Sequence, residues 1–321
     1  MMRIAFLAGV LVGAVLFTAA SAQPYPSKPI RMIVGFAPGG GTDVTARAVV
    51  QEFSEALGQR IVIDNRPGAN GVIGADVTAK SPVDGYTILM VNSGHTVNPG
   101  MYKKLPYDTI RDFAPVTLVA NLPNVLVTHP SLPPKTFPEF VRFAKARRGA
   151  ISYGSGGYGA SSHLAMELLK KTAGIDVIHV PYKSGGQSTA AILTGDVAVS
   201  FNTIPSAVPH IKAGRLRAIG VSSPQRSASM PDVPAIADMG YPGFNANGFA
   251  GLVAPAGTPA DAIEKLHAAM VKTIKLPAMH DRFITLGMDA VGNTPAEFGQ
   301  FIRTDMDKWT KLVRELNLTA Q

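Results

Sequence analysis

The sequence contains no cysteine among its 321 residues. Without a thiol, the protein has no disulfide framework, no Cys-ligated zinc, no iron–sulfur cluster and no cysteine nucleophile. Charged residues are also scarce, at 16%, whereas 46% of the residues are hydrophobic. This composition excludes a disordered chain. A length above three hundred residues favours two lobes over a single hydrophobic core.

Several catalytic and nucleotide-binding motifs are missing as well. There is no G-x-x-x-x-G-K-[ST] loop, no G-x-S-x-G and no H-E-x-x-H. Gly154-x-Gly156-x-x-Gly159 matches the dinucleotide pattern in form, but the acidic residue expected after the next strand is absent, because Asp176 precedes that strand. The seven histidines show no metal-ligand spacing, and of these only His163 lies beside a Gly-rich loop. We therefore expect no catalytic residue, no metal site and no cofactor.

The net charge is +8, but the Lys and Arg residues are scattered along the chain. Nucleic acid is therefore not an expected partner, although a net positive field could attract anionic solutes.

Residues 1–22 have the pattern of a signal peptide that is cleaved after Ala22. A short basic start, Met1-Met2-Arg3, precedes an apolar or small run over 4–20, and Ala20-Ser21-Ala22 fits the cleavage pattern. The alternative is an uncleaved anchor, but the run is short for a membrane span. No cysteine is available for a lipid anchor, and no later run reaches the roughly 18 apolar residues of a span. We therefore predict a periplasmic mature protein that does not span a membrane.

Strand and helix periodicities alternate after this segment. In the first part the expected strands are 30–36, 60–63 and 87–91, with helices at 44–57 and 71–80. In the second part the expected strands are 150–153, 177–180, 197–201 and 216–221, with helices at 137–148, 161–172 and 187–194. Amphipathic helices are expected at 260–274 and 296–316. The order predicts α/β units with mostly parallel sheets and helices on both faces.

Two extended segments, 116–127 and 244–254, lie between the α/β units. Two non-helical passages between two lobes predict a hinge of two crossing strands. We expect a discontinuous first lobe, made of 23–122 and 249–321, and a second lobe of 123–248.

Two Gly-rich turns stand between a strand and a helix, at 35–43 and at 154–163. A helix N-terminus has unpaired N–H groups and a partial positive charge, and glycine lets a ligand approach the backbone. Each turn is therefore a candidate anion site, although a tight turn capped by Asp43 or Ser161 would look the same. One such loop in each lobe predicts a cleft that grips an anion from both sides.

Ordered motifs along most of the chain resemble the tripartite tricarboxylate transporter substrate-binding proteins, also called the Bug family. They include Pro38-Gly39-Gly40-Gly41-Thr42-Asp43, Asn65-Arg66-Pro67-Gly68-Ala69, Asp84-Gly85-Tyr86-Thr87, His179-Val180-Pro181-Tyr182-Lys183 and Ala254-Pro255-Ala256-Gly257-Thr258-Pro259. The resemblance implies a two-lobed, monomeric periplasmic solute receptor of the Venus-flytrap type, which closes on a small carboxylate and delivers it to integral membrane transporter subunits. It also implies that backbone N–H groups and ordered waters of the two Gly-rich loops hold the carboxylates.

One position departs from the family pattern. Many members are expected to have Phe-Asp where this chain has Phe201-Asn202. Asn202 cannot supply a charge for a ligand amino group, which favours a carboxylate without one, such as a dicarboxylate. The expected ligand-binding residues are Phe36, Gly40, Gly41, Thr42, Asp43, Ser93, Ser155, Gly156, Gly157, Gly159, Ala160, His163 and Asn202. A periplasmic enzyme acting on a small carboxylate and a ligand-sensing receptor remain alternatives.

Overall fold

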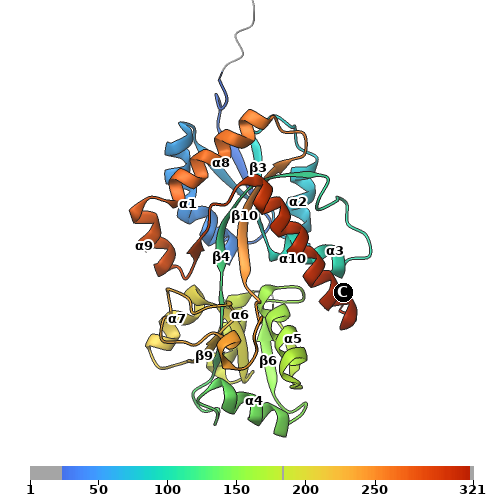
Figure 1. Cartoon of the computed structure of the whole chain (residues 1–321), viewed down its shortest axis with the longest axis vertical. Helices are drawn as coiled ribbons and strands as arrows, with labels where there is room; N and C mark the ends of the chain where they lie inside the picture. Colours follow the sequence, from blue (N-terminus) through green and yellow to red (C-terminus); the bar gives the residue numbers. More distant parts are fainter. Residues whose placement is uncertain (1–23, 183, 319–321) are drawn as a thin grey trace, which may run out of the picture.

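The computed structural model describes residues 24–182 and 184–318, and the expected signal peptide lies outside these ranges. The described chain forms two α/β lobes, one above the other in Figure 1, each built on its own sheet. The strands are β1 (Ile30–Val34), β2 (Ile61–Asn65), β3 (Thr87–Asn92), β4 (Phe113–Leu122), β5 (Asn124–Thr128), β6 (Ser152–Ser155), β7 (Ile178–Pro181), β8 (Val199–Thr203), β9 (Arg217–Val221), β10 (Gly248–Pro255) and β11 (Asp289–Ala290). The α-helices are α1 (Gly41–Leu57), α2 (Val72–Ala79), α3 (Ser93–Met101), α4 (Phe137–Ala146), α5 (Ser161–Ala173), α6 (Gly185–Thr194), α7 (Ile204–Lys212), α8 (Ala260–Ile274), α9 (Pro277–Thr285) and α10 (Pro295–Glu315). Short 3-10 turns occur at Ala69–Gly71 and Ile236–Met239.

Each sheet combines a parallel half with an antiparallel half. The first sheet has the order β11-β4-β10-β3-β1-β2, and the second has the order β7-β6-β8-β5-β9. In the first sheet β2, β1 and β3 are parallel, and in the second β7, β6 and β8 are parallel. The carboxyl ends of parallel strands meet at one edge of a sheet, which is where ligands bind in α/β folds. The helices α1, α3, α5 and α7 all begin at these edges.

The first lobe has a hydrophobic core on each face of its sheet. Alternate residues of β1 point to opposite faces, so Met32 joins the core formed with α1, α8 and α9, whereas Ile33 joins the core formed with α2 and α10. Burial on both faces explains why β1 is apolar except at Arg31, which is half-buried and donates to Asp64 of β2 (2.8 Å).

The C-terminal helix α10 contributes to the cores of both lobes. Phe298, near its start, packs in the first lobe, whereas Trp309 and Leu312, near its end, share a core cluster with Leu164 and Leu169 of α5. Figure 1 shows α10 running from the upper lobe down beside α5. The two lobes are therefore in apolar contact outside the strands that connect them.

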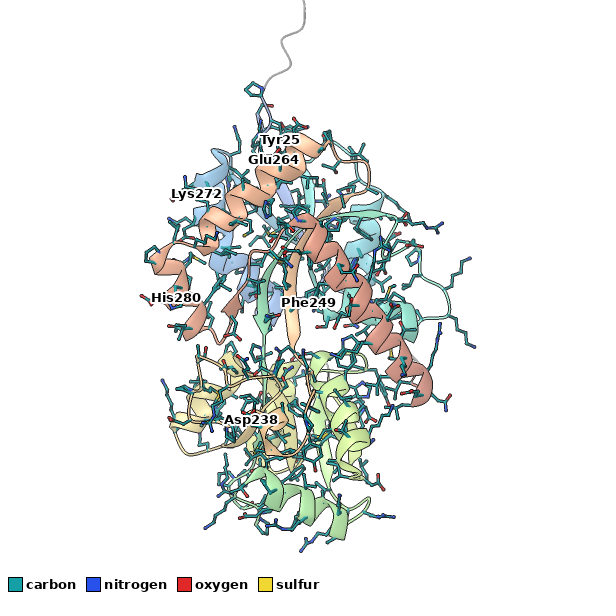
Figure 2. All side chains as sticks on the ribbon, in the orientation of Figure 1. Tyr25, Asp238, Phe249, Glu264, Lys272 and His280 are labelled. Atoms are coloured by element: carbon teal, nitrogen blue, oxygen red, sulfur yellow. The ribbon has the colours of Figure 1, made fainter. Side chains whose placement is uncertain are left out.

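Two neighbouring strands connect the lobes. Strand β4 of the first sheet passes through Pro123 into β5 of the second, and β10 returns the chain to the first sheet, paired antiparallel with β4. Figure 2 shows Phe249 on β10 just above the second lobe. This ring is buried and lies edge-on to Phe298 and Phe301 of α10, with ring centroids 6.3 and 5.0 Å away. The expected crossing strands are confirmed.

All the helices expected from periodicity are present, with ends that differ by a few residues. Helix α1 begins at Gly41 instead of residue 44, so its first turn is part of the Gly-rich loop. Three helices were not predicted: α3, α7 and α9. Helices α3 and α7 contain an interior proline, Pro99 and Pro209, which argues against a helix when it is read from sequence alone. None of the described helices is both long and apolar enough to cross a bilayer.

Candidate ligand-binding cleft

The first Gly-rich loop is braced by a buried aspartate. Asp43 accepts hydrogen bonds from the backbone of Gly39 (2.9 Å), from Arg47 (2.8 Å) and from Asn65 (2.9 Å). Burial opposes ionisation of Asp43, but these hydrogen bonds outweigh it and hold its pKa below the usual value. Both carboxylate oxygens are thus engaged within the first lobe, and the side chain fixes the path of the loop.

The N-terminus of α1 is left without a side-chain cap. Gly40 is the N-cap residue, and the chain enters the helix at Gly41. The first N–H groups of a helix have no acceptor in a preceding turn, which applies here to Gly41 and Thr42. The hydroxyl oxygen of Thr42 accepts from Asn92 (3.1 Å), which is the N-cap of α3. This contact joins the carboxyl ends of β1 and β3 into one edge.

Ser93, the next predicted site residue, is the first residue of α3. Its hydroxyl is buried and has no hydrogen-bond partner among the described residues. It lies one residue beyond Asn92, which bonds Thr42, so an unpaired hydroxyl stands near the first loop.

In the second Gly-rich loop, several N–H groups donate inside the loop itself. The N–H of Gly156 donates to Ser162 Oγ (3.0 Å), that of Gly157 to Ser155 Oγ (3.1 Å) and that of Gly159 to His163 Nδ1 (3.2 Å). The N–H groups of the first turn of α5 have no acceptor in a preceding turn. In this conformation, therefore, the backbone N–H groups that could donate to an anion are those at the start of α5.

His163 is part of a stack of rings behind the second loop. Its ring is stacked on His179 with centroids 4.3 Å apart, His179 is stacked on Tyr153 at 4.8 Å, and Tyr158 lies edge-on to both histidines. Burial lowers the pKa of His163 to about 3 and that of His179 to about 4, so both rings are neutral at pH 7. His163 itself is buried and accepts from the loop. In this structure it positions the loop.

A cavity of about 230 Å³ lies between the lobes, against the hinge. The first lobe contributes the first loop and the segment before β11, the hinge contributes the β4–β5 connection, and the second lobe contributes the start of α7. The lining residues are Gly39, Gly41, Val44, Leu122, Pro123, Thr203, Pro205, Ser206, Gly287 and Met288. None of these side chains is ionisable.

The lobes also touch at two places. At the cavity wall, a Cβ built on Gly287 would lie 2.5 Å from the Cβ of Ile204 in α7. Outside the cavity lining, a Cβ on Gly159 in the second loop would lie 3.1 Å from the side-chain nitrogen of Asn70 in the first lobe. The Gly-rich loops are thus brought to the same interlobe region, with the first loop on the cavity wall and the second against Asn70.

Asn202 lies at the end of β8 and is 2% exposed. Its Oδ1 accepts from Ser200 Oγ (2.9 Å), and Ser200 in turn bonds Ser188 of α6 (3.0 Å). Its Nδ2 has no hydrogen-bond partner among the described residues. The unpaired group of this side chain is therefore the Nδ2 donor. Asn202 lies one residue before Thr203, which lines the cavity.

Of the predicted first-loop residues, only Gly41 lines the cavity. Gly40 is the N-cap beside it, Thr42 and Asp43 are buried behind the loop, and the Phe36 ring lies against Gly71. Ser93 lies beside that loop, Asn202 lies beside the start of α7, and the second loop lies across the interlobe region.

The cavity wall also includes residues that were not predicted. Thr203, Pro205 and Ser206 form the start of α7, and a hydroxyl residue two positions before a proline is a helix-start signal that the sequence offers. Gly287 and Met288 carry no such signal, because only the tertiary fold places them here.

Metal-binding clusters are not found among the described residues, since no group of three or more His, Asp or Glu side chains could hold an ion.

Comparisons with known proteins agree on one family. Residues 45–318 match the model of the tripartite tricarboxylate transporter family receptor. Protein BugT of Bordetella pertussis is 37% identical over 297 residues, which are 92% of this chain and 91% of BugT. A solved periplasmic transporter superposes with a TM-score of 0.85 at 42% identity, covering 92% of this chain and 99% of its own. An R. palustris protein solved with adipate superposes with a TM-score of 0.84 at 30% identity, covering 90% of this chain and 97% of its own.

Proposed function

Because this chain belongs to the tripartite tricarboxylate transporter receptor family, we propose that it is a periplasmic receptor for a small carboxylate. It binds this ligand between its two lobes and delivers it to integral membrane subunits of a transporter. The ligand is a dicarboxylate that lacks an amino group. The family is one of receptors, and catalysis is not part of the proposed function.

The observation that carries this proposal is the exposure of the first turn of α1 on the interlobe cavity. Gly41 lines the cavity as the first residue of α1, where the helix presents unpaired N–H groups and a partial positive charge. The carboxylate of Asp43 is engaged by Arg47 and does not oppose an anion there. A relative of the same fold, at 30% identity, was solved with adipate, a dicarboxylate.

The charges around the cleft favour a ligand without an ammonium group. A buried ammonium needs an acceptor, preferably a charged one. Asp43 already accepts three hydrogen bonds from its own lobe, and the Oδ1 of Asn202 accepts one from Ser200. The unpaired Nδ2 of Asn202 is a donor, which suits a carboxylate oxygen.

The Ser155–His179 pair resembles a catalytic dyad in distance only. Ser155 Oγ and His179 Nε2 are 2.6 Å apart. However, Ser155 is fully buried, and the lowered pKa of His179, about 4, makes it a weak base. Ser155 Oγ also accepts from the N–H of Gly157. These contacts support a role for the pair in shaping the loop of a receptor.

A thermal-unfolding screen tests the proposal. Succinate, glutarate and adipate should stabilise the protein more than aspartate or glutamate at equal concentration. A ligand at 100 times its Kd raises the free energy of unfolding by about 2.7 kcal/mol, which is readily measured. Stabilisation by glutamate with no response to the diacids would contradict the assignment.

Export and lobe organisation complete the proposal. We propose that the chain is cleaved after Ala22, acts as a monomer, and divides into lobes at the β4–β5 connection and again before β10. The helix α10 also packs on the second lobe. Any movement of one lobe relative to the other must therefore either carry the end of α10 along or break that contact.

A further inference from the structure

The interlobe cavity has an apolar wall. Side chains of Val44, Leu122, Pro123, Pro205 and Met288 supply most of it, and the glycines add backbone. These apolar side chains can contact methylene or aromatic carbon of a ligand. The polar side-chain atoms of the cavity lining are the hydroxyl oxygens of Thr203 and Ser206.

The hydrogens of these two hydroxyls are already used. Thr203 Oγ1 donates to Ser206 Oγ (3.0 Å), and Ser206 Oγ donates to the carbonyl of Thr203 (2.8 Å). Neither has a hydrogen left for a ligand, and both lie on the α7 side of the cavity. Their remaining lone pairs could accept from a ligand hydroxyl at that one place. Away from these hydroxyls and from the backbone at the start of α1, which the carboxylate occupies in the proposed function, ligand hydroxyls would face mainly carbon.

The apolar wall is also fixed in position. Met288 is 2% exposed, and its sulfur lies 3.5 Å from Oγ1 of the buried Thr45, whose hydrogen is donated to the carbonyl of Gly41 (2.8 Å). Gly287, with φ of +63°, brings the same segment against Ile204 of the second lobe. A packed wall of this kind does not rearrange to provide new polar groups at small cost.

We propose that the part of the ligand in this cavity is unsubstituted hydrocarbon, and that the receptor discriminates against polyhydroxylated carboxylates of the same length. The inference rests on the proposed function, since it assumes that a carboxylate occupies the cleft. A hydroxyl buried without a partner lowers affinity by roughly tenfold or more. A chain with a hydroxyl on each internal carbon should therefore bind at least about a hundredfold more weakly than its unsubstituted counterpart.

Calorimetry on the full mature protein with matched acids tests this. The pairs are succinate and tartrate, adipate and galactarate, and hexanoate and gluconate, which have equal carbon number within each pair. In every pair that binds, the unsubstituted acid should have the higher affinity. For adipate over galactarate the ratio of affinities should be at least about a hundredfold.

A matched pair of variants locates the effect. Val44→Thr adds a hydroxyl to the cavity wall at nearly constant side-chain volume. It should weaken the binding of adipate and reduce the ratio of the affinities for adipate and galactarate. Val50→Thr makes the same change on the same helix, at a half-buried position outside the cavity lining, and should leave the ratio unchanged. Thermal unfolding of both variants verifies that they fold.

The outcomes separate the two proposals. If none of the six acids binds, the proposed function fails. If a hydroxylated acid equals or exceeds its partner, or if both valine variants shift the ratio alike, the apolar assignment is overturned while the receptor function stands.

Discussion

Replacing Gly41 by proline should remove one ligand donor with little cost to the fold. Gly41 is the first residue of α1, where proline is well tolerated because its N–H has no intrahelical acceptor. The preceding Gly40 has φ −73° and ψ 160°, an extended conformation that is allowed before proline. A Cβ built on Gly41 meets nothing within 4 Å. The variant thus deletes the N–H of a residue that lines the cavity.

The expected loss follows from the charge on the ligand. A hydrogen bond to a charged group contributes about 1.5–3 kcal/mol, which corresponds to a loss of affinity of roughly 10- to 150-fold. Calorimetry with a bound diacid measures it. Gly41→Ala is the matched control, since it adds a Cβ but keeps the N–H, and it should bind within a few-fold of the native protein. Equal binding by the proline and alanine variants would refute the assignment of this N–H as a donor.

The second lobe offers the same experiment at Ser161. This is the first residue of α5, and the preceding Ala160 has φ −64° and ψ 152°, again compatible with a following proline. Ser161→Pro should weaken binding to a similar extent, with Ser161→Ala as its control. Gly157 would be a poor choice, because its φ of +115° is closed to proline and its N–H donates to Ser155. If Ser161→Pro binds normally while Gly41→Pro does not, the second loop contributes no donor there.

Four further predictions follow from single features. Asn202→Asp should bring the affinities for aspartate and glutamate closer to those for diacids, and an unchanged ratio by calorimetry would show that this position does not face the ligand. Burial lowers the pKa of His95 to about 4 and of His163 to about 3, so on acidification from pH 7 to 5 the unfolded chain binds protons that the folded chain does not. Each residue should then lower the free energy of unfolding by up to about 2 kcal/mol, and denaturant titrations that give equal stability at the two pH values would contradict this. Trp309 is the sole tryptophan and is buried in the core that joins α10 to the second lobe, so ligand binding should change its emission if the lobes move, and Trp309→Phe should abolish the signal. Intact mass of periplasmic material should correspond to a chain beginning after Ala22, and a chain that retains Met1 would exclude cleavage.

Sequence periodicity located the elements whose apolar face is regular and missed those where proline is accommodated. In α3, Pro99 lacks the N–H that would bond the carbonyl of His95, and Thr109 Oγ1 donates to that carbonyl instead, at 3.4 Å. In α7, Pro205 falls in the first turn, where no intrahelical bond is lost. In α3 the partner that replaces the missing bond comes from another part of the chain, so the local pattern does not indicate that helix. In α7 the start signal at Thr203 and Pro205 is offset by Pro209 inside the helix, which lacks a backbone N–H.

Local chemistry indicates one part of the candidate site. A Gly-rich turn between a strand and a helix specifies an exposed helix N-terminus, and Gly41 does begin α1 and line the interlobe cavity. The role of His163 was not predictable, because its orientation depends on stacking with His179, a residue of a neighbouring strand. Met288 reaches the cavity only because the segment before β11 folds back over the first loop, and nothing in its local sequence indicates this.

Contacts outside the cleft also hold the two lobes together. Ser229 Oγ of the second lobe donates to the carbonyl of Ile284 in α9 at 2.7 Å, and Lys171 of α5 forms an ion pair with Glu315 of α10. These contacts, with the apolar cluster around Trp309, favour proximity of the lobes whether or not a ligand is present. In a receptor that closes on its ligand, as proposed here, such contacts reduce the binding free energy needed to populate the closed state, since apparent affinity scales with the fraction of competent receptor. Weakening a contact remote from the cleft should therefore lower the affinity for every ligand by the same factor and leave selectivity unchanged, because the proposed selectivity depends on the cavity wall.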